Sequence, residues 1–144
     1  MIKRTATAIW SGSLKDGKGL VSFGSGEFTG KYSFTSRFEE GEGPGTNPEE
    51  LIGAAHAGCF SMALAGDLAK NGYEVEEIMT KAIVSLEKLE SGYQITGIKL
   101  ETRAKVEDIE MKDFAEYASG AKKNCPVSKA LAAVDVRLEA RLAK

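Results

Sequence analysis

The chain has 144 residues, of which 42% are hydrophobic and 28% charged, with a formal net charge of −2. These values are typical of one globular domain, so we expect a single domain over residues 1–144. They provide no basic surface for nucleic acid and no polybasic anchor, and the longest apolar stretch is shorter than a membrane span, so we expect a soluble cytoplasmic protein that binds neither nucleic acid nor membranes.

The first part of the chain predicts short strands. Residues 5–10 alternate in polarity, Asp16-Gly17 is a turn signal, and residues 19–23 resume an extended pattern. This combination predicts a β-hairpin. Residues 32–38 predict a further strand, and residues 39–47 predict a loop because they combine glycine, proline and acidic residues.

A long helix is predicted next. Asn47 suits the N-cap, Pro48 the first helical position, and Glu50 the acid of a capping box. The residues from Leu51 to Ala69 are apolar on nearly every side of the helix, and Gly72 ends the pattern. A chain of this length has difficulty covering such a helix, so we expect a second copy to cover it.

The second half predicts strands and helices in a mixed order. Residues 81–89 and 93–106 predict two strands, and a slip in the alternation at Gly97 indicates a β-bulge. Helices at 110–123 and 126–132 and a strand at 134–142 complete the chain. The fold class is therefore α+β with antiparallel strands.

The two cysteines occupy different environments. Cys59 lies in the middle of the apolar helix, where a thiol ordinarily packs as a small hydrophobic group. It is beyond the first turn, so a cation from elsewhere is needed to activate it. Cys125 lies between two helices, before Pro126, and is either an ordinary loop thiol or a thiolate favoured by the next helix N-terminus.

Three other side chains could take part in chemistry. The single histidine, His56, shares a helix face with Cys59, and packing is favoured over roles as a base or a metal ligand. A zinc site is disfavoured because the chain has one His and two Cys. Arg37 is either a surface residue or held against a cleft, and Glu49 fits the first helical turn as an acid in any case.

Three segments resemble one known family. They are residues 45–64 (GTNPEELIGAAHAGCFSMAL), 124–131 (NCPVSKAL) and 36–39 (SRFE). Together they resemble the osmotically inducible protein C (OsmC) and organic hydroperoxide resistance (Ohr) family, and the similarity extends over essentially the whole chain. Ile52, Gly53 and His56, with the glycine-rich N-terminal hairpin, are more similar to the OsmC branch than to the Ohr branch.

The resemblance implies a fold and an activity. The fold would be OsmC/Ohr-like, with antiparallel sheets around a long buried helix and an intertwined homodimer with active sites at its interface. The activity would be that of an antioxidant thiol peroxidase of the stress response that reduces organic hydroperoxides without a metal or organic cofactor. Cys59 would be the peroxidatic cysteine and Cys125 the resolving one, joined in an intramolecular disulfide. Arg37 and Glu49 would be the charged pair that activates the Cys59 thiolate.

Further expectations follow from this assignment. We expect Phe34, Phe38 and Phe60 to receive the organic group, and a small dithiol or a lipoyl-type carrier to act as reductant. Glu49 and Cys59 are ten positions apart on one helix, or about 15 Å along its axis. One arginine therefore cannot reach both in the same chain, so Arg37 and Glu49 of one subunit should serve Cys59 of the other.

Two alternatives use the same fold without catalysis. In the first, the cysteines bind a thiol-reactive ligand without turnover. In the second, the protein is a structural dimer whose thiols are incidental. The joint presence of Arg37, Glu49, Cys59 and Cys125 disfavours both, because neither role needs all four residues.

Overall fold

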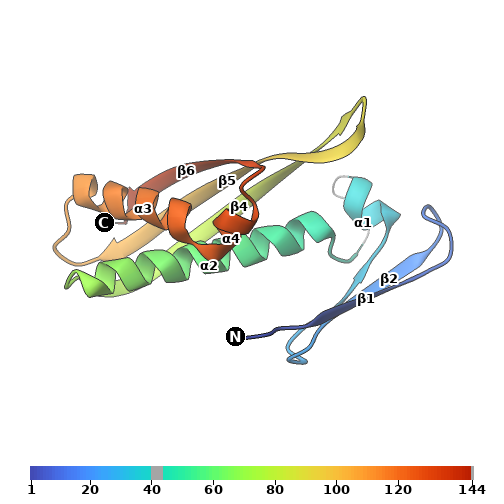
Figure 1. Ribbon diagram of the computed structural model, residues 1–144, viewed down its shortest axis with the longest axis horizontal. Helices are drawn as coiled ribbons and strands as arrows, with labels where there is room; N and C mark the ends of the chain where they lie inside the picture. Colours follow the sequence, from blue (N-terminus) through green and yellow to red (C-terminus); the bar gives the residue numbers. More distant parts are fainter. Residues whose placement is uncertain (40–43, 144) are drawn as a thin grey trace. The chain divides into compact units, whose positions relative to one another are not determined.

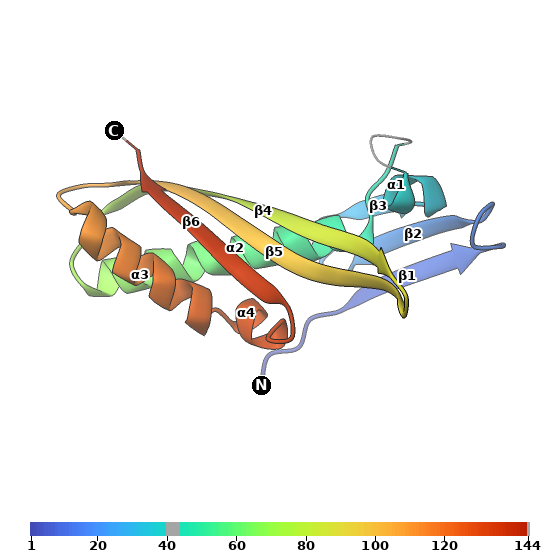
Figure 2. The same ribbon diagram turned by 90° about the horizontal axis from the view of Figure 1, so that it is seen from above.

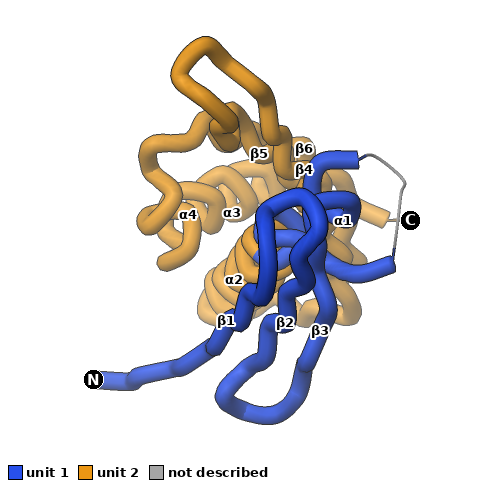
Figure 3. Tube along the Cα trace, turned by 90° about the vertical axis from the view of Figure 1, so that its right-hand side faces the viewer, with its two compact units in different colours: residues 1–51 blue, residues 52–144 orange. Residues whose placement is uncertain are grey.

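The computed structural model describes residues 1–39 and 44–143. The chain divides into two compact units, Met1–Leu51 and Ile52–Lys144, which Figure 3 shows in different colours. A single domain over residues 1–144 stays a prediction.

The first unit contains a three-stranded antiparallel sheet in the order β1-β2-β3. Its strands are β1 (Ala6–Ser11), β2 (Lys18–Phe23) and β3 (Thr29–Tyr32). The predicted hairpin is confirmed, since β1 pairs with β2 from Ala6 opposite Phe23 to Ser11 opposite Lys18.

The strand predicted for residues 32–38 is wrong after its first residue, because a short helix, α1 (Phe34–Phe38), follows β3. A capping box starts this helix. Ser33 Oγ accepts a hydrogen bond from the backbone N–H of Ser36, and Ser36 Oγ accepts one from the backbone N–H of Ser33. Of the loop predicted for residues 39–47, positions 40–43 lie outside the described residues.

The long helix is present as α2 (Pro48–Lys70). Its predicted cap is confirmed, because Asn47 Oδ1 accepts from the backbone N–H of Glu50 at 2.8 Å. The Glu50 carboxylate, predicted to reach back to Asn47, accepts the hydroxyl proton of Thr46. Beyond the helix, Gly72 has φ +85°, a conformation that favours glycine, so the helix ends close to the predicted position.

The second unit contains the sheet β4-β5-β6, formed by β4 (Val75–Leu89), β5 (Gly92–Val106) and β6 (Asp135–Leu142). The bulge predicted at Gly97 is confirmed. Ser85 pairs with Gly97 and the next residue, Leu86, pairs with Ile95, so β5 contains one extra residue at this point.

Two helices connect β5 to β6: α3 (Met111–Asn124) and α4 (Pro126–Ala130). This crossover returns the chain to the end of the sheet at which β5 begins. Strand β6 therefore pairs with β5 in parallel, from Gly97 opposite Asp135 onward. The α+β class is confirmed, but this one pairing differs from the expected antiparallel arrangement. Figures 1 and 2 show α2 and α3 on the same face of the sheet.

Helix α2 buries one face and exposes another. His56, Phe60, Leu64 and Leu68, four positions apart along the helix, have no exposed surface, and the three apolar ones join a core shared with β5 and α3. Met62, by contrast, is 78% exposed. By length and composition α2 is apolar enough to cross a membrane, a test that core helices of soluble proteins also pass.

Candidate active site

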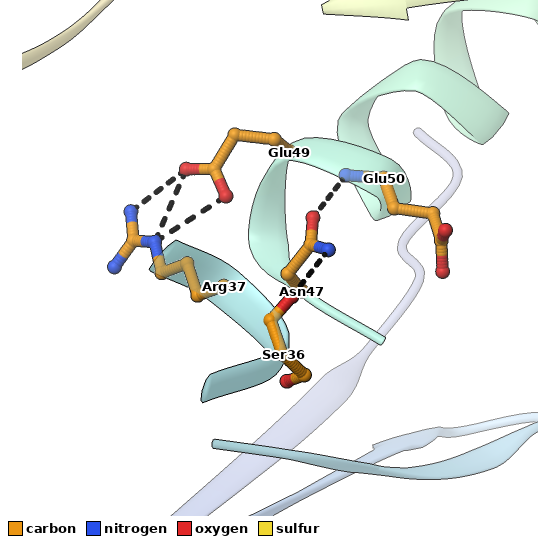
Figure 4. A network of polar contacts seen from close by, with 5 residues as sticks. All are labelled: Ser36, Arg37, Asn47, Glu49 and Glu50. Atoms are coloured by element: carbon orange, nitrogen blue, oxygen red, sulfur yellow. Dashed lines mark hydrogen bonds and ion pairs between the residues drawn. The ribbon is translucent and has the colours of Figure 1, made fainter. Parts of the chain in front are cut away.

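The charged pair predicted from the sequence forms in the first unit. The Arg37 guanidinium donates from Nη2 to Glu49 Oε1 at 2.8 Å, and its Nε lies 3.2 and 3.3 Å from the two carboxylate oxygens. Glu49 is only 7% exposed, whereas the Arg37 side chain keeps 36% of its surface exposed, so a buried carboxylate orients a partly open cation. Figure 4 shows the remaining guanidinium nitrogen turned away from Glu49.

Hydrogen bonds between α1 and the start of α2 position this pair. Asn47 Nδ2 donates to the carbonyl of Ser36 at 3.0 Å, while the same side chain caps α2 (Figure 4). Ser36 Oγ also donates to the carbonyl of Thr46 at 2.7 Å. Arg37 is the residue after Ser36, and Glu49 is two residues after Asn47. Because these bonds join the two segments, they fix the two charged side chains relative to each other.

An aromatic cavity of about 450 Å³ lies beside Arg37 in the first unit. Phe34 and Phe38 line it, with ring centroids 4.9 Å apart, and the Arg37 guanidinium carbon lies 5.0 Å from the centroid of Phe38. Trp10 and Tyr32 contribute the other large rings. The cavity therefore combines an apolar wall with one cation.

Phe60, in contrast, lies in the core of the second unit with no exposed surface. Its ring packs among buried apolar side chains of that unit, so within this chain it has no open face for an organic group. Phe60, predicted to receive the organic group, is thus a core residue in the structure of this chain.

Both cysteines lie in the second unit and both are free thiols. Their side chains interact directly, and each influences the pKa of the other. They differ in exposure: Cys59 is partly exposed, whereas Cys125 has no exposed surface. As expected, Cys125 is an extended residue between α3 and α4, with φ −61° and ψ 133°.

The surroundings of Cys59 favour the neutral thiol. Burial raises the pKa of Cys59, the backbone N–H of Val127 offsets part of this, and the neighbouring Cys125 raises it further. None of these groups is a cation, and they all belong to the second unit. Activation of Cys59 thus needs a positive charge in addition to these neighbours, as the sequence indicated.

The surroundings of Cys125 favour the thiolate. Burial, the largest single cause, acts to raise its pKa, but hydrogen bonds with the side chain and backbone N–H of Ser128, the Cys59 side chain and the backbone N–H of Val127 together hold the pKa of Cys125 below its usual value. Cys125 Sγ lies 3.3 Å from Ser128 Oγ and 3.3 Å from the backbone nitrogen of Ser128. Cys125 is therefore the more acidic of the two thiols within this chain.

His56 belongs to the same cluster, although the sequence favoured a packing role. Its Nε2 lies 2.7 Å from Ser128 Oγ, and burial lowers the pKa of His56 below its usual value. Sequence reasoning missed Ser128 and the N–H of Val127. The available signal for Ser128 was its place three residues after Cys125, where the backbone N–H meets a capping side chain.

No group of three or more His, Cys, Asp or Glu side chains suited to a metal ion occurs within residues 1–39 and 44–143. The predicted residues are thus brought together as two clusters. Arg37, Glu49, Phe34 and Phe38 form one in the first unit, and Cys59 and Cys125 form the other in the second.

Comparisons with known proteins agree on one family. The family model for OsmC-like proteins matches residues 41–139. Peroxiredoxin OsmC of Escherichia coli (strain K12) is 47% identical over 133 residues, which are 92% of each chain. The organic hydroperoxide resistance protein OhrB of Bacillus subtilis (strain 168) is 34% identical over 97 residues, 66% of this chain and 69% of that protein.

Solved structures show the same fold. The crystal structure of OhrB from Bacillus subtilis matches with a TM-score of 0.74 and 30% identity, covering 94% of this chain and 97% of that one. An OsmC-like protein of unknown function from Vibrio cholerae matches with a TM-score of 0.77 over 97% and 99% of the two chains, at 19% identity.

Proposed function

Because the chain belongs to the family of OsmC-like proteins, we propose that it is a cysteine-based peroxidase that reduces organic hydroperoxides to alcohols. Its relatives include a protein named as a peroxiredoxin and others named for organic hydroperoxide resistance. The observation that carries the proposal is a pair of interacting thiols of unequal exposure. The chemistry uses side chains alone, in the reducing cytoplasm.

Cys59 is the peroxidatic residue, because its thiol is the one that is partly exposed. Its thiolate attacks the distal oxygen of ROOH, the O–O bond breaks, and the alcohol leaves after taking up a proton. Cys59 becomes a sulfenic acid. The buried position of Cys125 keeps it from meeting the hydroperoxide first.

Cys125 is the resolving residue. Its thiolate attacks the sulfur of the Cys59 sulfenic acid, so the S–S bond forms and the S–O bond breaks, and the hydroxide leaves as water after taking up a proton equal to the one that Cys125 released on ionisation. The interaction between the two side chains supports this step, since a disulfide needs adjacent cysteines. A small dithiol or a lipoyl-type carrier then restores both thiols.

Arg37 and Glu49 activate Cys59 from the partner subunit of a homodimer. The Cys59 thiol lacks a cation among the neighbours that shift its pKa, and Arg37 is a cation whose fork is oriented by a buried carboxylate. Both Glu49 and Cys59 belong to α2, about 15 Å apart along its axis, which disfavours one arginine serving both in a single chain. The exposed Met62 face of α2 supports a second copy that covers it.

Phe34 and Phe38 receive the organic group. The cavity that they line beside Arg37 has the volume of a small-molecule site and apolar walls. Burying an apolar substituent there favours alkyl and aryl hydroperoxides over hydrogen peroxide by about 1–3 kcal/mol per well-buried group.

One experiment tests the chemistry. The reduced protein receives one equivalent of cumene hydroperoxide, and intact mass and free thiols are measured. We expect the loss of two hydrogens and of both thiols, reversed by dithiothreitol, with a Cys125→Ser variant instead retaining a sulfenic acid that a dimedone probe traps. An unchanged mass with both thiols free would contradict the proposal and favour a protein that binds thiol-reactive ligands without turnover.

A further inference from the structure

His56 is a buried polar side chain that the proposed peroxidase cycle does not use. It lies on the buried face of α2, with no exposed surface, between apolar neighbours of the same helix. Its Nε2 is 2.7 Å from Ser128 Oγ, and its Nδ1 has no hydrogen-bond partner in the part of the chain that is described. A buried polar group of this kind is costly unless it has a role, so its one bond, to Ser128, is significant.

The direction of this hydrogen bond follows from the unpartnered nitrogen. Buried donors without acceptors are rarer than buried acceptors without donors, so Nδ1 is the bare acceptor of a neutral ring. Burial keeps His56 neutral by lowering its pKa. With the proton on Nε2 the ring donates to Ser128 Oγ and leaves a bare acceptor at Nδ1, whereas the other tautomer would leave a bare donor there.

Ser128 connects His56 to the sulfur of Cys125, because its hydroxyl contacts both. In the thiol form Cys125 Sγ donates to Ser128 Oγ at 3.3 Å; once Cys125 is a thiolate it has no proton to donate, and the same contact is made by the Ser128 hydroxyl donating to the sulfur. The backbone N–H of Ser128 points at the same sulfur, also at 3.3 Å. On the thiolate, two donors from one residue thus converge on Cys125, and a His56 that donates to Ser128 Oγ orients one of them.

We propose that His56 and Ser128 are positioning residues that hold a hydroxyl donor against the Cys125 sulfur and so speed closure of the disulfide. This inference rests on the proposed function. In the closing step the Cys125 thiolate attacks the sulfur of the Cys59 sulfenic acid, the S–O bond breaks, and the hydroxide leaves as water with a proton from solvent that replaces the one Cys125 released on ionisation. The Ser128 hydroxyl stabilises the thiolate before the attack and gives up no proton of its own.

Other groups around Cys125 add to this stabilisation, because the Cys59 side chain and the backbone N–H of Val127 also lower the pKa of Cys125. The titratable groups in this cluster are Cys59 and His56, both on α2. From α3, the Lys122 ammonium donates to the carbonyl of Val136 at 3.2 Å. Within α4 the thiolate thus has hydrogen bonds from Ser128 and Val127, and the one from the Ser128 side chain can be removed by a point mutation while Cys59 is kept constant.

A titration tests the role of the hydroxyl without any hydroperoxide. In a Cys59→Ser background the thiolate absorbance in the ultraviolet reports Cys125 alone. We expect Ser128→Ala to raise the pKa of Cys125 by about one unit, equivalent to a tenfold smaller thiolate fraction. Ser61→Ala is the matched control, because Ser61 Oγ is also bonded within the unit, to Thr80 Oγ1 at 2.7 Å. Equal pKa values in the two variants would overturn the proposal.

A second comparison tests the role of His56. His56→Gln keeps an amide donor of similar reach, whereas His56→Leu removes it. We expect the pKa of Cys125 to rise in His56→Leu and to stay near its original value in His56→Gln. Identical pKa values in the Gln and Leu variants would show that His56 only fills space, and would overturn its part of the proposal.

A kinetic measurement connects the pair to the reaction. With both cysteines present, the rate of disulfide closure is measured after one equivalent of cumene hydroperoxide and divided by the rate of Cys59 oxidation. A tenfold smaller thiolate fraction, partly offset by the greater nucleophilicity of a more basic thiolate, should lower this ratio about threefold in Ser128→Ala. An unaltered ratio would contradict the inference. If the original chain forms no disulfide, the proposed function fails, while the titration still decides the role of the pair.

Discussion

Cys59 and Cys125 lie side by side, but their surroundings oppose the order in which they are proposed to react. The more acidic thiol is Cys125, which is fully buried, and the less acidic one is Cys59, which is partly exposed. Access to the hydroperoxide therefore decides the order of attack, and a cation must compensate for the raised pKa of Cys59. This makes the forked pair of Arg37 and Glu49 the most informative place for a substitution.

We expect Arg37→Lys to lower the second-order rate of Cys59 oxidation by cumene hydroperoxide about tenfold or more. Lysine keeps the positive charge but loses the fork that Glu49 orients through Nε and Nη2. Stopped-flow measurement of disulfide formation gives this rate. Arg4→Lys is the control, since Arg4 is an exposed arginine bonded to a backbone carbonyl. Equal rates in the two variants would contradict the proposed role.

At this scale the sequence predicted some contacts and missed others. Arg37 and Glu49 were found together because they match a family pattern, and their pairing is present. The bond between His56 and Ser128 joins residues far apart in the chain, in α2 and α4, and no local pattern encodes such a pairing. Full burial of Phe60 also depends on three-dimensional packing, because apolar residues line pockets and cores alike.

Among the elements, the short helix α1 depends most on side-chain hydrogen bonds. It has five residues, none of them buried, so it cannot be stable through its own backbone bonds or core packing. The Ser33 capping box forms it, and Asn47 attaches it to the start of α2. The orientation of Arg37 thus depends on a few polar contacts.

We expect Asn47→Ala to lower the free energy of unfolding by about 1–2 kcal/mol, the usual effect of losing a helix cap. The rate of Cys59 oxidation should fall as well, because the bond from Asn47 to Ser36 also positions Arg37. Urea denaturation measures the first effect and stopped-flow kinetics the second.

Asn71→Ala is the matched control for this variant. Asn71 is exposed at the other end of α2, where its amide donates to the carbonyl of Asp67 at 2.8 Å. Its loss should change stability by less than about 0.5 kcal/mol. If the two asparagine variants unfold at the same urea concentration and react equally fast, the positioning role of Asn47 is wrong.

Prediction of the elements succeeded where the signal was local. The cap at Asn47 and the bulge at Gly97 each depend on a few adjacent residues, and both were found. Helix α1 was missed because alternating aromatic residues are also typical of a strand. The capping box of Ser33 and Ser36 stabilises a helix there instead. The direction of β6 was missed because alternation identifies a strand but not the side or direction of its partner.

For the whole molecule, the exposed apolar side chains of α2 matter most. One face of the helix packs in the core of the second unit, while Met62 on another face is 78% exposed. Apolar surface of this kind favours association. It supports the proposed homodimer, in which Arg37 of one subunit would reach Cys59 of the other.

A mixed dimer distinguishes sites shared between subunits from sites within one chain. One chain contains Cys59→Ser and the other Arg37→Ala, and two different affinity tags isolate the mixed species. If sites are shared, each mixed dimer has one intact site, so we expect about half of the original peroxidase activity. Activity close to that of the two parent variants would place each site within a single chain.

The parallel pairing of β6 with β5 also orders events during folding. The hairpin of β4 and β5 joins strands that are neighbours in the sequence, so it can form early, whereas β6 docks only after α3 and α4 have crossed back over the sheet. Cys125 is the junction between those two helices. A chain emerging from the ribosome therefore carries Cys59 for some time before its partner thiol is in place. During that interval an oxidised Cys59 would be open to other thiols such as glutathione, until α3 and α4 bring Cys125 beside it.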